Sequence, residues 1–235
     1  MLPSPELQSG NLRPILSLIR RRELIRVNEI FYSIQGESSY AGQPCVFVRL
    51  SGCNLRCIYC DTQYATNQSI SISVNDIIER IIAFQCSLVE ITGGEPLLQD
   101  ETPELIRNLS DRGFKVLLET NGTQNIDLVQ GNAVCIVDIK CPGSGESDKM
   151  DWDNIHRLRQ QDEVKFVLMT PSDYEWAKQT IRQYSLTEKV KVLFSPVYDQ
   201  MDPAALAEWI LKDRLKVRLQ LQLHKIIWPN QERGR

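Results

Sequence analysis

Three cysteines that lie close together are the residues of this sequence best suited to chemistry. Cys53, Cys57 and Cys60 form a Cys-x3-Cys-x2-Cys loop. Structural zinc sites and most iron–sulfur clusters use four protein ligands, so the loop is one thiolate short of a closed site. Three thiolates at this spacing can hold a cubane cluster and leave one iron open for a non-protein ligand. The alternatives are a chance grouping, or a zinc loop that a distant His or Cys completes.

The spacing of this loop resembles that of radical S-adenosylmethionine (SAM) enzymes. The resemblance implies a 4Fe-4S cluster on Cys53, Cys57 and Cys60, with the amino and carboxylate groups of SAM on the open iron. Reduction of such a cluster cleaves SAM to a 5′-deoxyadenosyl radical. The run Gly93-Gly94-Glu95-Pro96 resembles the superfamily motif that meets the SAM amino group. Glycine lets a backbone approach a ligand closely, and a carboxylate suits an ammonium.

The segments around the cysteines narrow the resemblance to one family. Glu29–Glu37 reads Glu-Ile-Phe-Tyr-Ser-Ile-Gln-Gly-Glu, Phe47–Cys53 reads Phe-Val-Arg-Leu-Ser-Gly-Cys, and Cys60 is followed by Asp-Thr. In this order the motifs resemble 7-carboxy-7-deazaguanine synthases, and the resemblance runs from about Glu29 to Trp228. Short activases of glycyl-radical enzymes share the cysteine loop but lack the Ser-x-Gln-Gly-Glu segment.

The resemblance implies an activity, its cofactors and its partners. The activity is a ring-contracting carbon–nitrogen lyase reaction, in which 6-carboxy-5,6,7,8-tetrahydropterin becomes 7-carboxy-7-deazaguanine and ammonia is released, on the route to queuosine and other 7-deazapurines. The implied cofactors are the 4Fe-4S cluster, regenerated SAM and Mg²⁺ at the substrate. The implied partners are a flavodoxin-like or ferredoxin-like electron donor and a second copy of the chain in a homodimer.

The family's substrate-binding residues carry over to matching positions of this sequence. The backbone of the Gln-Gly turn and the carboxylate after it would hold the guanidine-like edge of the pterin, as carboxylates hold Arg. An arginine on the following strand would clamp the substrate carboxylate; the alternative is a structural Asp or Glu partner for this arginine. The implied set is Ile34, Gln35, Gly36, Glu37, Arg49 and Thr92.

SAM and magnesium positions follow by the same comparison. The implied SAM-binding set is Tyr59, Cys60, Asp61, Gly93, Gly94, Glu95, Asp138, Ile139 and Lys140. Asp138 departs from the Ser-Pro-Lys that much of the family carries there, which puts its SAM contact in doubt. The hydroxyl of Thr62 would bind Mg²⁺, a hard cation that prefers oxygen ligands. The alternative for Thr62 is a helix cap or a turn.

The C-terminal segment Val217–His224 alternates apolar and polar residues with period two. This pattern predicts a strand with four polar side chains on one face. A solvated edge strand is one interpretation. The other is a site face, and it makes His224 the candidate catalytic residue, because the pattern near it resembles the family's C-terminal pattern near the substrate. We expect His156 at the surface, and Cys45, Cys86, Cys135 and Cys141 as buried apolar residues.

Composition limits the classes of protein to which the chain can belong. It has 235 residues, of which 42% are hydrophobic and 24% charged, which suits one globular α/β domain. A net charge of −3 provides no positive electrostatic potential that would attract nucleic acid or an anionic membrane. Seven cysteines, an odd number with three clustered, favour a reducing, cytoplasmic location. No apolar run approaches the ~20 residues of a membrane span. We expect residues 1–24 to form an N-terminal arm and residues 25–235 to form a single domain.

Strands and helices alternate after the arm. Parallel sheets with right-handed crossovers arise from this alternation, and their ligands bind at the carboxyl ends of the strands. The alternation alone allows either an open doubly wound sheet or a barrel that lacks the full eight strand–helix pairs. The resemblance implies the second, a partial (βα) barrel of the radical SAM type with about six to seven parallel strands. The expected strands are Cys45–Leu50, Leu88–Thr92, Lys115–Thr120, Cys135–Lys140, Val164–Met169, Val190–Ser195 and Val217–His224.

Capping residues mark the expected helices. Ser73 would cap Val74–Phe84, and Thr102-Pro103 would begin a helix that ends before Gly113. Ser172 with Glu175 predicts a capping box, and Asp202-Pro203 would open Ala204–Lys212.

Overall fold

A nine-stranded, mostly parallel sheet organises the chain in this computed structural model, which describes residues 24–231, 233 and 234. The strand order is β3-β1-β2-β4-β5-β6-β7-β8-β9, and all neighbours from β2 to β9 are parallel. The strands are β1 (Leu24–Ile34), β2 (Pro44–Leu50), β3 (Ile70–Ser73), β4 (Leu88–Gly93), β5 (Lys115–Thr120), β6 (Val134–Lys140), β7 (Glu163–Leu168), β8 (Lys191–Pro196) and β9 (Arg218–Leu219).

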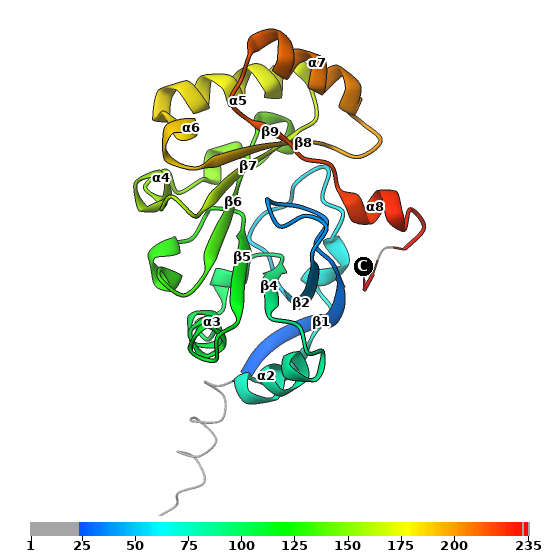
Figure 1. The fold of residues 1–235 in the computed structure, drawn as a ribbon, viewed down its shortest axis with the longest axis vertical. Helices are drawn as coiled ribbons and strands as arrows, with labels where there is room; N and C mark the ends of the chain where they lie inside the picture. Colours follow the sequence, from blue (N-terminus) through cyan, green and yellow to red (C-terminus); the bar gives the residue numbers. More distant parts are fainter. Residues whose placement is uncertain (1–23, 232, 235) are drawn as a thin grey trace, which may run out of the picture.

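The sheet is an open arc (Figure 1), because its end strands β3 and β9 pair with β1 and β8 and not with each other. This confirms the predicted partial barrel and its parallel strands. Sequence reasoning missed β1 and β3, the two strands that pair antiparallel at one edge. The predicted arm 1–24 lies outside the described residues, apart from Leu24, which begins β1.

Helices cover the outer side of the arc (Figure 1). The helices are α2 (Val74–Ala83), α3 (Thr102–Asp111), α4 (Asn154–Arg157), α5 (Pro171–Tyr184), α6 (Leu186–Lys189), α7 (Pro203–Asp213) and α8 (Leu223–Ile227). In α2, Ser73 accepts a hydrogen bond from the Asp76 N–H at 3.1 Å, as predicted. Asp202 caps α7 in the same way.

The capping box predicted for α5 was wrong by two residues. Thr170 is the N-cap, and its side chain pairs with the Asp173 backbone while the Asp173 carboxylate accepts from the Thr170 N–H. Pro171 decides the position, because proline is favoured at the first helical residue, where no N–H is needed. Glu175 instead forms an ion pair with Lys178.

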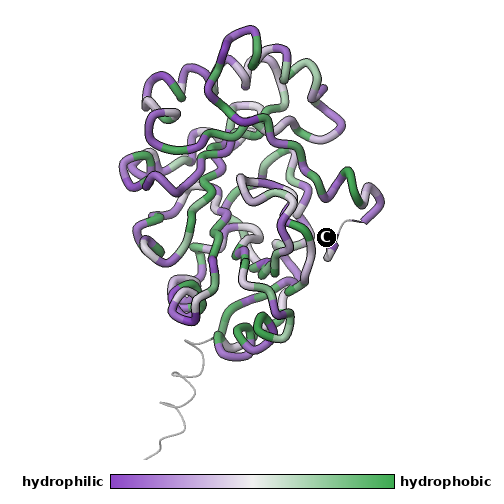
Figure 2. The backbone as a smooth tube through the Cα atoms, in the orientation of Figure 1, coloured by the Kyte–Doolittle hydropathy of each residue, from purple (hydrophilic) through white to green (hydrophobic). Residues whose placement is uncertain are grey.

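Two hydrophobic clusters lie on opposite faces of the sheet. The large cluster fills the space between the sheet and its helices, with apolar helix residues such as Ile77 and Leu105 fully buried. The small cluster lies on the inner face and includes Phe47, Leu117 and Ile136. Hydrophobic residues follow the central strands almost continuously in Figure 2, as expected for strands buried on both faces. Above the small cluster the inner face becomes polar.

The predicted strand Val217–His224 was mostly wrong. β9 is two residues long, and α8 begins at Leu223. After β9 the chain stops pairing with β8 and forms hydrogen bonds to the turn at Gly36. The Leu223 N–H and the Gln220 side chain both donate to the Gly36 carbonyl oxygen. The described part of the chain holds no helix long and apolar enough to cross a membrane.

Candidate active site

One cavity of about 730 Å³ opens on the inner face of the arc, at the carboxyl ends of the parallel strands. Its wall also includes the cysteine loop and the C-terminal segment. It brings together residues that are far apart in sequence, as parallel sheets do. The predicted site residues that line it are Ile34, Gln35, Gly36, Glu37, Arg49, Cys53, Cys57, Tyr59, Cys60, Asp61, Thr62, Thr92, Gly93, Gly94, Asp138, Lys140 and His224.

The cysteine loop is held against the end of β4 by its backbone. The Gly94 N–H donates to the Leu50 carbonyl at 3.3 Å, and the Glu95 N–H to the Gly52 carbonyl at 2.9 Å. A Cβ atom on Gly94 would collide with the Gly52 carbonyl oxygen and lie 2.7 Å from the Cys53 Cβ. The paired glycines therefore let the loop pack closely on β4, in addition to forming part of the cavity wall.

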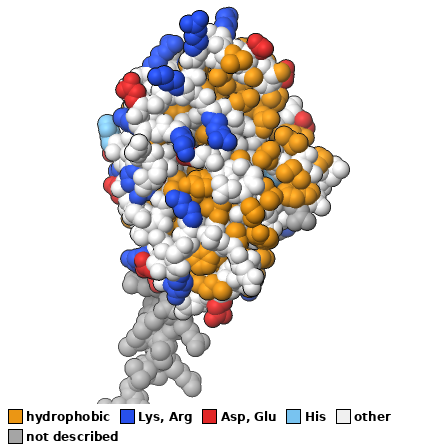
Figure 3. Space-filling view, in the orientation of Figure 1, with side chains coloured by type: hydrophobic (Ala, Val, Ile, Leu, Met, Phe, Trp, Pro, Cys, Tyr) orange, Lys and Arg blue, Asp and Glu red, His pale blue; other side chains and the backbone are white. Residues whose placement is uncertain are grey.

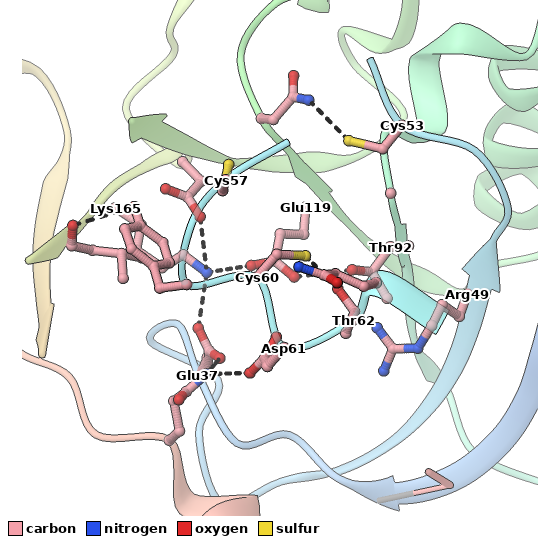
Figure 4. Close-up of a pocket in the computed structure, with 18 of the residues that line it drawn as sticks. Glu37, Arg49, Cys53, Cys57, Cys60, Asp61, Thr62, Thr92, Glu119 and Lys165 are labelled. Carbon is pink, nitrogen blue, oxygen red and sulfur yellow. Dashed lines mark hydrogen bonds and ion pairs between the residues drawn. The ribbon is translucent and has the colours of Figure 1, made fainter. Parts of the chain in front are cut away.

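All three thiols of the loop face this cavity, a donor set that fits a cluster with three cysteine ligands (Figure 4). Burial raises the pKa of Cys57 to about 11, and the Lys140 ammonium acts in the opposite direction. A cluster needs thiolates, so a nearby cation favours it. In the described part of the chain, no three His, Cys, Asp or Glu side chains are gathered around a point for a single metal ion. A preformed zinc site is therefore not found there.

Charged and aromatic groups surround the thiols. Lys140 pairs with Asp138 at 2.8 Å. Burial acts to lower the pKa of Lys140, but Asp138 together with Tyr59 and Cys57 outweighs burial and raises this pKa. Asp138 keeps one carboxylate oxygen, Oδ1, buried and without a hydrogen-bond partner. Burial raises the pKa of the Tyr59 hydroxyl. Asp61 pairs with Lys225, which outweighs burial and lowers the pKa of Asp61.

Two residues of the predicted SAM-binding set lie behind the cavity wall. Glu95 is fully buried and its carboxylate accepts from the Leu97 N–H, the Asn121 N–H and the Thr120 hydroxyl. Burial nevertheless raises the pKa of Glu95 to about 7. Ile139 is fully buried in the large hydrophobic cluster. These carboxylate and alkyl groups face protein, so they support the cavity wall and do not form its surface.

The Gln35–Glu37 turn also lines the cavity. The side-chain amide of Gln35 donates through Nε2 to Glu90 and accepts through Oε1 from the Glu37 N–H at 2.9 Å. The Glu37 carboxylate accepts from Lys165 at 2.9 Å and from the Gln222 side chain at 2.9 Å. Figure 4 shows Glu37 and Glu119 on either side of the Lys165 ammonium.

Arg49 forms an ion pair with a structural carboxylate, Glu29, which was the alternative expected for an arginine on a buried strand. Glu29 lies beside it in register on β1, and the Arg49 Nε donates to the Glu29 carboxylate at 2.8 Å. The guanidinium also lies over the Phe31 ring, 5.7 Å from its centre. Among the described residues, its two terminal nitrogens donate to no acceptor. Arg49 is therefore positioned by Glu29 and retains donors for a ligand in the cavity.

Thr62 and Thr92 both turn hydroxyls toward the cavity. Thr62 precedes the short 3-10 helix Gln63–Thr66, but its side chain makes no capping hydrogen bond, and its hydroxyl lies 3.8 Å from the Cys60 sulfur. The Thr92 hydroxyl donates to Glu119 at 2.9 Å. Burial of the Glu119 carboxyl acts to raise its pKa, but Lys165 and this hydrogen bond outweigh it and hold the pKa at about 2.

His224 reaches the cavity from α8. Its imidazole packs against Gly36, where any side chain would collide with it. Burial lowers the pKa of His224 below its ordinary value, against the opposing effect of Glu37 and Asp61. Of the four polar residues expected on one face of Val217–His224, Gln222 and His224 line the cavity, whereas Arg218 is exposed and Gln220 is buried. His156 is exposed, as expected.

Several cavity residues were missed by sequence reasoning. Glu90 and Lys165 lie in the middle of strands, Glu119 lies near the end of β5, and Gln222 lies just before α8; all four line the cavity. The available signal was a single charge within a buried parallel strand, as in Leu-Val-Glu-Ile and Val-Lys-Phe-Val. Burial, with Glu119 and Glu37 nearby, raises the pKa of Glu90 well above its ordinary value.

Comparison with known proteins agrees with this geometry. The profile of the Radical SAM superfamily matches residues 47–139. A 7-carboxy-7-deazaguanine synthase of Chlorobaculum tepidum is 46% identical over 89% of this chain and 97% of its own length. That of Koribacter versatilis is 43% identical over 89% of this chain and 100% of its own length. The chain belongs to the 7-carboxy-7-deazaguanine synthase family. Membership confirms the predicted resemblance and implies a radical SAM enzyme with a 4Fe-4S cluster and SAM.

Solved structures support the fold of this family member. The crystal structure of QueE from Escherichia coli aligns with a TM-score of 0.69 at 23% identity, and covers 85% of this chain and 94% of that one. SuiB of Streptococcus suis bound to S-adenosylmethionine aligns with a TM-score of 0.52 at 15% identity, over 73% of this chain and 45% of that one. At these identities the likeness concerns the fold.

Proposed function

We propose that this chain is a radical SAM lyase that converts 6-carboxy-5,6,7,8-tetrahydropterin to 7-carboxy-7-deazaguanine with release of ammonia. The observation that carries the proposal is 46% identity to a 7-carboxy-7-deazaguanine synthase over 89% of the chain. The cavity is consistent with it, because three thiols line one part and a turn that carries the Glu37 carboxylate lines another.

The chain's own groups bind and orient, while the cofactors carry the difficult chemistry. When bound, the cluster and SAM supply radical chemistry: reductive cleavage of SAM and abstraction of a hydrogen atom from the substrate. Cys53, Cys57 and Cys60 would hold the cluster. Lys140 would lie near the SAM carboxylate, and the buried Asp138 Oδ1 offers an acceptor to a hydroxyl of SAM. Tyr59, Gly93 and Gly94 would complete the SAM wall.

The substrate would bind between the Gln35–Glu37 turn and Arg49. A carboxylate such as Glu37 can accept two N–H groups from the planar N–C–N edge of a pterin. The terminal nitrogens of Arg49 would pair with the substrate carboxylate, because Glu29 occupies its Nε. Thr92 and His224 line the space between these contacts, with the imidazole neutral near pH 7 because burial lowers its pKa.

Magnesium would bind beside the substrate through the Thr62 hydroxyl. The hydroxyl caps no helix, and its weak contact with the Cys60 sulfur at 3.8 Å leaves its oxygen able to bind a cation. Mg²⁺ keeps several waters and takes few protein oxygens. The Thr62→Ala variant should retain cluster content and SAM affinity and lose stimulation by Mg²⁺. An unchanged response to Mg²⁺ would reduce Thr62 to a turn residue.

The proposed partners are an electron donor and a second copy of the chain. The cysteine loop reaches the surface at Ile58, which is 70% exposed, so a flavodoxin-like or ferredoxin-like protein can approach it. Ile226 and Ile227 on α8 are exposed, and Figure 3 shows hydrophobic side chains gathered on the side where Figure 1 places α8. A homodimer would cover them, which light scattering after size exclusion tests directly.

An anaerobic turnover assay tests the function. The reconstituted protein is mixed with carboxytetrahydropterin, SAM and a strong reductant, and products are identified by mass. The expected products are 7-carboxy-7-deazaguanine and ammonia, with SAM largely regenerated. Cleavage of SAM without any change in the pterin would reject the proposed substrate while retaining the radical SAM assignment.

A further inference from the structure

A buried lysine in the middle of β7 joins the two halves of the proposed substrate site. The Lys165 side chain is 5% exposed, and its ammonium lies on the inner face of the sheet while Val164 and Phe166 on either side are buried in the large cluster. A buried ammonium requires charged or polar partners. Lys165 has three carboxylate partners: Glu37 at 2.9 Å, Asp138 at 3.5 Å and Glu119.

Each of these partners belongs to a different segment. Glu37 follows β1, Glu119 is the second-last residue of β5, and Asp138 lies in β6. Glu119 in turn accepts from the Thr92 hydroxyl of β4, and Glu37 from the Gln222 side chain near α8. The ammonium of β7 therefore contacts three other segments directly, and through them it is linked to β4 and to the segment before α8. Two of the connected residues, Glu37 and Thr92, are proposed to face the substrate.

The same strand anchors the Gln35–Glu37 turn a second time. Glu163, two residues before Lys165 and on the same face, accepts from the Ser39 N–H at 3.0 Å and from the Ser39 hydroxyl. Ser39 lies two residues after Glu37. Glu163 and Lys165, two successive inward-facing residues of β7, thus both bind the short loop that contains Glu37 and Ser39. Neutralising the Lys165 charge would not require the second contact, so the pair of contacts fixes the position of the loop.

We propose that Lys165 is a positioning residue of this site, whose ammonium fixes the Glu37 carboxylate and the Glu119–Thr92 pair in the orientation that the pterin requires. The inference rests on the proposed function, because it names what holds the groups assigned to that substrate. Without the ammonium, the carboxylates of Glu37 and Glu119 repel each other in a buried space and turn away from their present directions. The ring of the pterin then loses its directed acceptor.

The Lys165→Met variant tests this in the reconstituted enzyme. Methionine keeps the length of the side chain and removes the charge. The KM for carboxytetrahydropterin should rise by about tenfold or more, the loss expected of one misplaced charge-assisted hydrogen bond. Turnover should fall as well, with more 5′-deoxyadenosine formed per product. SAM affinity and cluster content should stay within about twofold, because Asp138, the partner that Lys165 shares with the SAM side, keeps its closer ion pair with Lys140 at 2.8 Å.

The matched control is Lys178→Met. Lys178 is also a largely buried lysine with two carboxylate partners, Glu175 at 2.9 Å and Asp213 at 2.5 Å, but it lies on α5 and does not line the cavity. Its variant should lose stability and keep the pterin KM. If Lys165→Met and an active wild type have the same KM for the pterin, the inference is overturned and the proposed function stands. If the wild type itself does not convert the pterin, the proposed function is rejected.

A second variant keeps the test decisive if Lys165→Met assembles poorly. Lys165→Met combined with Glu119→Gln removes the ammonium and one of its carboxylates, so the buried charge is again balanced. If Lys165 positions Glu37, this double variant regains thermal stability and cluster content and still shows the raised pterin KM. Recovery of the wild-type KM would mean that Lys165 serves charge balance alone, and would overturn the inference.

Discussion

At the scale of single residues, the sharpest difference is between cysteines that face the cavity and cysteines that do not. Cys57→Ala should abolish cluster assembly and SAM cleavage, because two thiolates cannot retain a cubane. Cys86→Ala is the control, since Cys86 donates to the Pro44 carbonyl and does not line the cavity. Iron content and 5′-deoxyadenosine formation measure both. Normal values for the Cys57 variant would refute the cluster assignment.

A substitution at Arg49 tests whether the geometry of its guanidinium matters in addition to its positive charge. Arg49→Lys keeps a cation but cannot donate to Glu29 and hold a substrate carboxylate in a fixed fork at the same time. Substrate affinity should fall by roughly tenfold or more, as expected for a lost charge-assisted hydrogen bond. SAM affinity should hold, which separate titrations of pterin and SAM into the reconstituted variant can measure. The opposite result would mean that the substrate and SAM sides of the cavity are exchanged.

Residue chemistry could be predicted where a local motif carries it. The thiols, Glu37, Arg49 and Lys140 lie in motifs with characteristic spacing, and all line the cavity. Glu90 and Lys165 have no motif. Their position depends on which strands become neighbours and which face turns inward, and a single charge in an apolar run does not reveal that. The Glu29 partner of Arg49 was likewise hidden, because β1 was not predicted.

At the scale of elements, the end of β4 controls the cysteine loop. Gly94→Ala should force the loop away, because the new Cβ collides with the Gly52 carbonyl oxygen and approaches Cys53. Such overpacking costs typically 1–3 kcal/mol, so we expect about this loss of unfolding free energy together with lower iron content after reconstitution. Urea denaturation of the apoprotein and iron analysis measure the two effects.

Gly131→Ala is the comparison for this variant. Its φ of +86° disfavours a side chain, but a Cβ there meets nothing within 4 Å. It should lose about 1–2 kcal/mol from backbone strain and keep its iron content. Equal iron loss in both variants would mean that general instability, and not displacement of the loop, explains the effect of Gly94→Ala.

The elements themselves were predictable to different degrees. Strands β4 to β8 are short apolar runs between capped helices, so local sequence determines them. The segment Val217–His224 has the period of a strand, yet hydrogen bonds to Gly36, a residue almost two hundred positions away, bend it into α8. Periodicity reports which side chains share a face. It does not report a tertiary contact that ends the strand.

At the scale of the whole molecule, the open arc explains why one cavity collects so many charges. Parallel strands present their carboxyl ends at one edge, and the helices cover the other face. The C-terminal segment then closes the open side through contacts of Gln222 with Glu37 and of Lys225 with Asp61. The site is therefore complete when the last described segment has docked, and its stability is coupled to that of the fold.

This coupling predicts how the stability of the apoprotein depends on pH. Burial lowers the pKa of His224 in the folded protein, whereas the unfolded chain takes up this proton near pH 6.5. As pH falls below 6.5, the unfolded state binds more protons than the folded state, so the free energy of unfolding decreases until the folded-state pKa is passed. Above 6.5 the contribution of His224 is constant.

The His224→Asn variant isolates this effect from the titration of carboxyl groups. Urea unfolding of both apoproteins at pH values on either side of 6.5 should give a difference in unfolding free energy that shrinks as the pH falls. As the pH falls, the wild type loses unfolding free energy because the imidazole of His224 takes up a proton more readily in the unfolded state. The variant has no imidazole at this position and does not show this loss. A difference that stays constant across this range would mean that His224 is solvated in the folded protein and that α8 does not seal the cavity. A widening difference would mean that Glu37 and Asp61 stabilise a protonated imidazole, so that the charged form would face the substrate.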